Sequence, residues 1–352
     1  MGKGEFGVET EKPVGNRGIR PYWKRCWFWS LLIAAVLLPT VYTYFKLKFD
    51  RPMGSGPAGA TVESEAFSEV WSERKTLLLG IGDSVTAGFG VAAPYNYVNR
   101  LAENPPDEFP DMQGKSLRKI YPNLEVRNIA VSGSTSLQHE NHINDDGWLE
   151  KQPDDVYGIV VMTSGGNDII HNYGRSAPKE GAMYGATLEQ AGPWIDNFRD
   201  RLDRMMIAIS EKFPGGCTIY LADIYDPSDG VGDAPSVFLP HWPDCMKILD
   251  AYNQVIRECT AKHENVVHVP MHDVFLGHGI HCREFYREHY RRDDPTYWFH
   301  DNLEDPNIRG YDAIRRVFLN TILNTEKNKR FAPPEASARG QFIVATFMAT
   351  SS

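Results

Sequence analysis

The most constraining feature of the sequence is an uncharged run of twenty residues, Cys26–Phe45 (CWFWSLLIAAVLLPTVYTYF). As a helix this run spans roughly 30 Å, about the thickness of the hydrocarbon core of a bilayer. Tryptophans lie at its start and tyrosines at its end, as expected where aromatic rings meet lipid headgroups. The run therefore predicts one transmembrane helix over residues 26–45 and not a buried core helix.

The flanks of this run predict how the chain is oriented in the membrane. The run is longer than the apolar part of a signal peptide, and no small-residue cleavage site follows it directly, so we expect an uncleaved signal anchor. Six Lys and Arg precede the run and three follow it before residue 52. Because cytoplasmic flanks carry the excess of basic residues, we expect a single-pass membrane protein with a cytoplasmic segment 1–25 and an exported remainder.

The charge of the chain is distributed unevenly. The net charge is −9, but residues 1–51 hold nine Lys and Arg against four Asp and Glu, which leaves −14 for the rest. A nucleic-acid partner is excluded for a body this acidic, because phosphate backbones require a basic face. The partner expected at this point is the membrane, through the N-terminal helix.

Beyond the span, the sequence predicts one large domain between two irregular segments. Residues 46–69 are rich in Gly, Pro and Ser and read as a linker, and residues 331–352 read as a C-terminal tail. Between them, over residues 70–330, β-rich apolar runs alternate with helical patterns, which predicts βαβ units on a parallel sheet. The expected strands are Thr76–Ile81, Leu124–Ala130, Val156–Met162, Cys217–Ile224 and Val266–Val269.

Helical periodicity adds three elements. An apolar stripe at spacings of three and four runs from Trp194 to Ile209, a second helix covers about Cys245–Lys262, and a last one begins with Asp305 as N-cap and Pro306 as its first residue. The cysteines Cys217, Cys245, Cys259 and Cys282 would lie in the exported domain, where their pairing is not readable from sequence.

A strand ending in a glycine turn supplies the candidate nucleophile. Leu77–Ile81 runs into Gly82, Asp83 and Ser84, which places a serine at the carboxyl edge of the sheet, where open α/β sheets bind ligands. Asp83 is interpreted as a hydrogen-bonding turn residue and not as a catalytic acid. A phosphate loop is not supported, because no Gly-Lys-Ser/Thr follows.

Two further blocks follow the next two strands. Asn128–Ser136 contains Ser132-Gly133-Ser134, and the third strand is followed by Gly165-Gly166-Asn167-Asp168. Together with Gly82-Asp83-Ser84, these blocks resemble the SGNH (GDSL-type) hydrolase family over residues 75–325. The resemblance implies a three-layer α/β/α flavodoxin-like domain with a five-stranded parallel sheet. It also implies Ser84 as nucleophile and an oxyanion hole formed by Ser84, Gly133 and Asn167, which suits acyl transfer.

The fourth block departs from the family pattern, in which Asp-x-x-His supplies the base. The stretch from His300 to Tyr311 keeps Pro-Asn and Gly-Tyr but lacks that histidine; Glu304 or Asp305 stands in its place, depending on the direction of counting. We expect His278, which is flanked by glycines after the fifth strand, to act as general base, oriented by Glu304 or Asp301. His300 is the alternative base.

No metal or cofactor is expected. His272, Asp273, His278 and His281 cluster in the sequence, but a serine with oxyanion donors already accounts for hydrolysis. The sequence thus predicts an exported, membrane-anchored esterase, lipase-like enzyme or glycan deacetylase that acts on a small-molecule, lipid or glycan ester. The alternatives are a non-catalytic ligand-binding homologue, because the fourth block is altered, and a glycan O-acyltransferase that uses the same site.

Overall fold

The computed structural model describes residues 1–2, 7 and 22–331. The predicted segment 1–25 and the predicted tail therefore lie almost entirely outside the described residues. The described chain forms two units, one ending at Asp50 and one starting at Arg51.

The first unit contains one long helix, α1 (Tyr22–Phe49), which extends the predicted span by several residues at each end. Its segment Cys26–Phe49 is long and apolar enough to cross a membrane. This property follows from length and composition, so the predicted orientation stays a prediction.

The second unit is built on a parallel sheet of five strands in the order β2-β1-β3-β4-β5. The strands are β1 (Thr76–Ile81), β2 (Leu124–Asn128), β3 (Tyr157–Met162), β4 (Cys217–Ala222) and β5 (Val266–Val269). This order is the flavodoxin-like one, so the predicted fold class is confirmed. The apolar runs predicted these strands well because β1 and β4 are buried along their whole length, as is usual for parallel strands covered on both faces.

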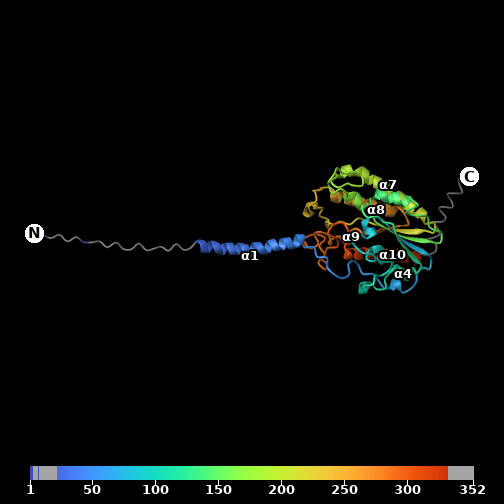
Figure 1. The fold of residues 1–352 in the computed structure, drawn as a ribbon, viewed down its shortest axis with the longest axis horizontal. Helices are drawn as coiled ribbons and strands as arrows, with labels where there is room; N and C mark the ends of the chain where they lie inside the picture. Colours follow the sequence, from blue (N-terminus) through green and yellow to red (C-terminus); the bar gives the residue numbers. More distant parts are fainter. Residues whose placement is uncertain (3–6, 8–21, 332–352) are drawn as a thin grey trace. The chain divides into compact units, whose positions relative to one another are not determined.

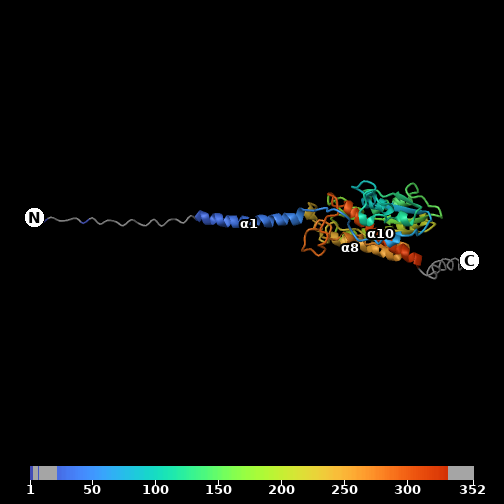
Figure 2. The ribbon, with the colours of Figure 1, turned by 90° about the horizontal axis from the view of Figure 1, so that it is seen from below.

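Helices cover both faces of the sheet (Figures 1 and 2). Most of them lie in the connections between consecutive strands. They are α2 (Ser84–Ala87), α3 (Tyr97–Ala102), α4 (Leu117–Ile120), α5 (Ser136–Asn144), α6 (Gly166–Ile170), α7 (Leu188–Lys212), α8 (Cys245–Lys262), α9 (Met271–Phe275) and α10 (Ile308–Phe331). In Figure 1, α7 and α8 lie on one side of the sheet and α10 lies on the other.

Each face of the sheet has its own apolar core. On one face Leu79 packs in a cluster with Phe198 of α7 and Ile256 of α8. On the other face Leu78 packs in a cluster with Tyr97 of α3 and Phe318 of α10, whose rings stack at a centroid distance of 5.0 Å. Neighbouring residues of β1 and of β3 point alternately into the two clusters, so both strands are packed on both faces. This packing holds their carboxyl ends in place.

The last helix starts later than predicted. Pro306 pairs with Phe299 in an isolated antiparallel bridge and so does not begin the helix. Asn307 caps it instead, because its side-chain oxygen accepts hydrogen bonds from the backbone N–H groups of Arg309 (3.0 Å) and Gly310 (3.1 Å).

The segment predicted as a linker packs on the domain. Ala58 and Val62 are buried in the core cluster that contains α10. The N–H of Ala58 donates to Asp312 Oδ2 at 3.0 Å, and the Arg309 guanidinium donates to the carbonyls of Gly56 and Pro57. The compact unit thus starts at Arg51, about twenty residues earlier than expected, because a Gly- and Pro-rich segment can still be held by buried polar partners.

Candidate active site

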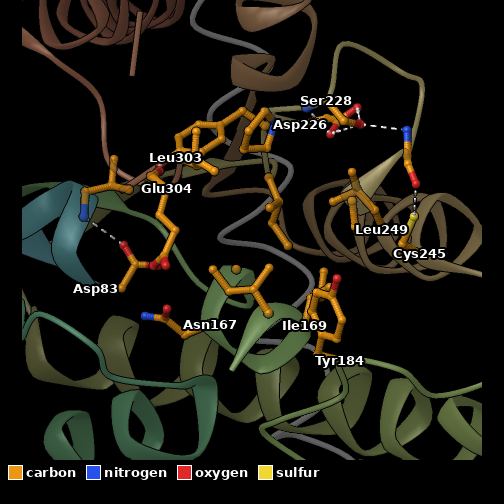
Figure 3. A pocket seen from close by; sticks show the side chains of 18 of the residues that line it. Asp83, Asn167, Ile169, Tyr184, Asp226, Ser228, Cys245, Leu249, Leu303 and Glu304 are labelled. Carbon is orange, nitrogen blue, oxygen red and sulfur yellow. Dashed lines mark hydrogen bonds between the residues drawn. The ribbon is translucent and has the colours of Figure 1, made fainter. Parts of the chain in front are cut away.

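A cavity of about 270 Å³ lies at the carboxyl ends of β1, β3 and β4. Figure 3 shows Asp83, Asn167 and Glu304 on one side of the view, with Ile169 and Leu249 further across; two more polar residues, Asp226 and Ser228, lie on the side of Leu249. Ser84 also lines this cavity.

The turn after β1 presents Ser84. Gly82 has φ +148°, and a Cβ atom there would lie 2.5 Å from Thr163 Oγ1, so the close approach of β1 to β3 requires glycine. Ser84 is the first residue of α2, and Asp83 is the N-cap: its Oδ1 accepts from Val85 N–H at 3.1 Å and from the Thr163 hydroxyl at 2.9 Å. Burial raises the pKa of the Asp83 carboxyl to about 6. Asp83 therefore makes the turn hydrogen bonds predicted for it.

The second and third blocks meet through Asn167. Its side-chain nitrogen donates to the carbonyl of Ser134 at 2.9 Å, which orients the amide and leaves its second N–H for another acceptor. Gly133 is exposed, has φ +81°, and has open space where a Cβ would stand. Ser84 and Asn167 line the cavity directly, whereas Gly133 is not among the lining residues.

Buried hydrogen bonds join the second and third blocks to each other and to α5, a network that sequence analysis did not predict. His139 lies between the hydroxyls of Ser134 (2.7 Å) and Ser164 (2.9 Å), and burial lowers its pKa to about 3, which keeps it neutral. Asp168 accepts from the backbone N–H of Ser136 at 2.8 Å. The only sequence signal for this network was that Asp168 and Ser136 belong to the two quoted blocks.

Of the carboxylates predicted near the base, Glu304 lines the cavity. Burial, and next to it the negative charge of Asp305, raise the pKa of Glu304 to about 7. The Tyr225 hydroxyl donates to the backbone carbonyl of Glu304 and so fixes the segment. Asp305 is buried and accepts from the Asn302 amide at 2.6 Å, whereas Asp301 is exposed and does not line the cavity.

The structure does not bring His278 to the cavity. Its imidazole stacks on Trp298, and its Nδ1 is 3.1 Å from the carbonyl of Thr296. The glycines beside it, expected to let the loop bend toward the sheet edge, are fixed instead: the N–H groups of Gly277 and Gly279 both donate to Asp229 Oδ1. Burial lowers the pKa of His278 to about 4.

His300, the alternative base, is also outside the cavity lining. Its ring lies against Gly90, where a Cβ atom would be 2.4 Å from Nε2. Nε2 is buried without a hydrogen-bond partner among the described residues. Of the five described cysteines, none is in a disulfide.

One group of possible metal ligands is present in the described part of the chain, and it does not line the cavity. Asp203, Cys259 and His263 have ligand atoms within 4.8 Å of one another on α7 and at the end of α8. Asp203 is already paired with Lys262 and, at 3.0 Å, with His263. These contacts account for the cluster as an ion-pair network between two helices.

The chain matches a known protein family over the residues that form the cavity. The model of the GDSL-like Lipase/Acylhydrolase family matches residues 81–312, from the end of β1 to the start of α10. A search of curated proteins found no match.

Among solved structures, a catalytic mutant of an acetylxylan esterase from Geobacillus stearothermophilus is similar at 19% identity and a TM-score of 0.47, covering 72% of this chain and 96% of that one. A member of the lipolytic protein G-D-S-L family from Veillonella parvula DSM 2008 is similar at 12% identity and a TM-score of 0.42, covering 71% and 97%.

The family match covers about two thirds of the chain and includes the serine turn, the Asn167 block and the altered fourth block. The chain is therefore an ester-bond hydrolase that belongs to the GDSL-like lipase/acylhydrolase family.

Proposed function

We propose that the protein is a membrane-anchored serine hydrolase that cleaves carboxylic esters with a medium-length acyl chain, with Ser84 as nucleophile and Glu304 as general base. The observation that carries the proposal is that Ser84, Asn167 and Glu304 line one cavity. In this proposal Glu304 takes the role first expected of His278.

In the acylation step, Ser84 Oγ forms a bond to the ester carbonyl carbon while its proton passes to the Glu304 carboxylate. The negative charge on the carbonyl oxygen is stabilised by the Asn167 side-chain N–H and the backbone N–H of Ser84, two residues that line the cavity. The carbon–oxygen bond to the alcohol then breaks, and the alcohol leaves with the proton from Glu304. Water repeats the sequence on the acyl-enzyme, again with Glu304 as base.

The proton affinity of Glu304 supports this role. A general base works best when its pKa lies near the working pH, and burial raises the pKa of Glu304 to about 7. A half-buried carboxyl group with a raised pKa, in a cavity that a serine also lines, is also a typical sign of a functional site.

The acyl-chain preference rests on the part of the cavity away from Asp83. Its walls are apolar side chains from α6, α8 and the loop after β4, chiefly Ile169, Val237, Leu239, Trp242 and Leu249. An acetyl group would leave this volume of about 270 Å³ largely unfilled, whereas each additional buried methylene stabilises the complex by about 0.8 kcal/mol.

Labelling with a fluorophosphonate probe tests the proposal, since the probe reacts only with an activated serine. We expect labelling of the wild-type protein, none of Ser84→Ala, and slow labelling of Glu304→Gln. A correctly folded wild-type protein that resists the probe would contradict the proposal and favour the non-catalytic alternative.

Anchoring by α1, with the N-terminus in the cytoplasm and the hydrolase domain outside, is part of the same proposal. It is supported by the length and apolar character of Cys26–Phe49 and by the six basic residues that precede the apolar run. A periplasmic or extracellular reporter fused after residue 60 should be active, and activity of a cytoplasmic reporter there would reverse the orientation.

A further inference from the structure

An exposed aromatic pair lies on the domain close to the point where the chain leaves the proposed membrane span. Phe285 and Tyr286 are 65% and 59% exposed, and their rings meet edge to face at 5.6 Å. They belong to residues 282–287, which we call the aromatic loop. Single exposed apolar residues are ordinary, but an adjacent pair of large aromatic rings calls for an explanation.

The aromatic loop is near the start of the domain because residues 51 and 52 contact Tyr297, whose neighbour Trp298 is hydrogen-bonded to the segment that leads into the loop. The carbonyl of Pro52 accepts from Tyr297 N–H at 2.8 Å, and the Arg51 guanidinium lies over the Tyr297 ring at 5.6 Å. The N–H of Trp298, the next residue after Tyr297, donates to the carbonyl of His278 at 3.0 Å. The N–H of Cys282, the first residue of the loop, donates to the carbonyl of Gly279 at 3.1 Å, so backbone hydrogen bonds link the start of the loop to the segment that Pro52 contacts.

Chain length then limits how far this region can be from a bilayer. Phe49 is the last residue of α1, and three extended residues reach at most about 11 Å. Pro52 cannot swing away from the domain, because Arg309 donates to the carbonyls of Met53, Gly56 and Pro57 immediately after it. Once α1 spans a membrane, the contact between Pro52 and Tyr297 lies within about 11 Å of the end of the span.

We propose that the aromatic loop is a membrane-docking element that inserts Phe285 and Tyr286 into the headgroup layer of the bilayer that holds α1. Aromatic side chains are favoured at that depth, where the ring is in an apolar layer and a polar group of the side chain can meet water. In the loop, Arg287 is paired with Glu284 at 2.8 Å, and its guanidinium stands over the Tyr286 ring at 5.6 Å, which fixes the orientation of that ring.

Docking of this loop also orients the cavity, and in this respect the inference rests on the proposed function. His281, just before the loop, bonds through Nε2 to Asp233 at 2.6 Å and through Nδ1 to Glu284 at 2.7 Å. Asp233 precedes the short 3₁₀ helix Ala234–Val237, and Val237 lines the cavity. The docked loop therefore holds one wall of the cavity beside the bilayer, which suits an ester carried by a membrane lipid.

The depth of the loop can be measured with the full-length chain in phosphatidylcholine nanodiscs. A nitroxide label is placed on Phe285→Cys in a background that lacks the two accessible thiols (Cys26→Ser and Cys245→Ser), with Ile207→Cys as the matched control, because Ile207 is 51% exposed on α7. We expect the label at 285 to be more accessible to oxygen than to a polar nickel complex and the label at 207 to show the reverse. Equal exposure of both labels to the nickel complex would overturn the proposal.

The catalytic consequence is measured separately. Phe285→Asp should hydrolyse an acyl ester dissolved in the same bilayer about tenfold more slowly than the wild type, with unchanged turnover of a water-soluble ester. Ile207→Asp should change neither rate. Equal rates for Phe285→Asp and wild type on the bilayer ester would contradict the orienting role. If the wild type cleaves neither ester, the proposed function fails, and the label depths alone decide whether the loop docks.

Discussion

Trp298 covers one face of the His278 imidazole, with the ring centroids 3.4 Å apart and the ring planes within 5° of parallel. This stack and the contact between Nδ1 and the Thr296 carbonyl hold the imidazole of His278, the predicted base, outside the residues that line the cavity. Glu304 is the carboxylate of the altered fourth block that lines it.

Replacement of these two candidates separates their roles. Glu304→Gln keeps the shape of the side chain but cannot accept the serine proton, so kcat should fall by about 10²–10⁴-fold. His278→Gln should retain kcat within a small factor and should instead lower the melting temperature, because the stack on Trp298 is lost. Steady-state kinetics on a soluble ester and thermal melts of both variants provide the measurement. Loss of turnover in His278→Gln with a normal melt would restore the original hypothesis.

The pH dependence of catalysis should follow the ionisation of Glu304. Because only the carboxylate accepts a proton, kcat/KM should rise with pH and reach half of its maximum near pH 7. Asp305→Asn removes the negative charge that helps to raise this pKa, so the rising limb should move to lower pH. Asp301→Asn, at an exposed position outside the cavity, is the control and should leave the profile in place.

The same carboxyl group should destabilise the folded protein at alkaline pH. The pKa of Glu304 is raised from 4.5 to about 7, so the folded protein keeps a proton that the unfolded chain releases. Stability is then lost as the pH rises from 4.5 through 7. Glu304→Gln should melt at a higher temperature than wild type at pH 8, with a much smaller difference at pH 4.5. An unchanged difference between the two pH values would show that the side chain is not buried as described.

The preferred length of the acyl chain should depend on the apolar residues that line the cavity away from Asp83. With wild-type protein, kcat/KM for a series of p-nitrophenyl esters should increase by roughly fourfold per methylene until the cavity is filled. Leu249→Trp should move the optimum to shorter chains, because Leu249 lines the cavity. Leu188→Trp, at an exposed position at the start of α7, should not. A wild-type preference for acetyl esters would contradict the acyl-chain proposal.

Burial of residues before Val70 predicts a stability effect that a linker would not have. Val62→Ala should lower the free energy of unfolding by about 1–2 kcal/mol, because Val62 is fully buried against the α10 cluster. Thr61→Ala, one residue earlier and exposed, should be close to neutral. Chemical denaturation of the two variants gives the comparison, and two neutral results would support the original linker interpretation.

Much of the fold could be predicted from patterns that are local in the sequence. Four of the strands could be predicted because they are short apolar runs ended by turn residues, and β2 because Leu124 and Val126 alternate with polar residues. The helix α7 could be predicted because its apolar stripe repeats every three or four residues. The serine turn could be predicted for the same reason: Gly82 and Asp83 act within a few residues of Ser84.

The features that sequence analysis missed depend on residues far apart in the chain. His278 is held by Trp298 and, through its neighbours, by Asp229, and neither contact has a local signature. The raised pKa of Glu304 arises from burial in the assembled cavity. Ala58 and Val62 lie in a Gly- and Pro-rich segment whose composition indicates a flexible chain, yet α10 supplies its partners from more than 250 residues away.

The contacts of Arg309 with the carbonyls of Met53, Gly56 and Pro57 bear on whether the domain can be shed from the cell. A protease must draw several residues of its target into an extended strand, and a segment whose carbonyls are held by a buried guanidinium resists this. The residues between the end of α1 and Pro52 are too few to offer such a strand. Release by proteolysis would require the segment to detach from α10 first, so a hydrolase anchored by α1 as proposed should remain with its membrane for as long as it stays folded.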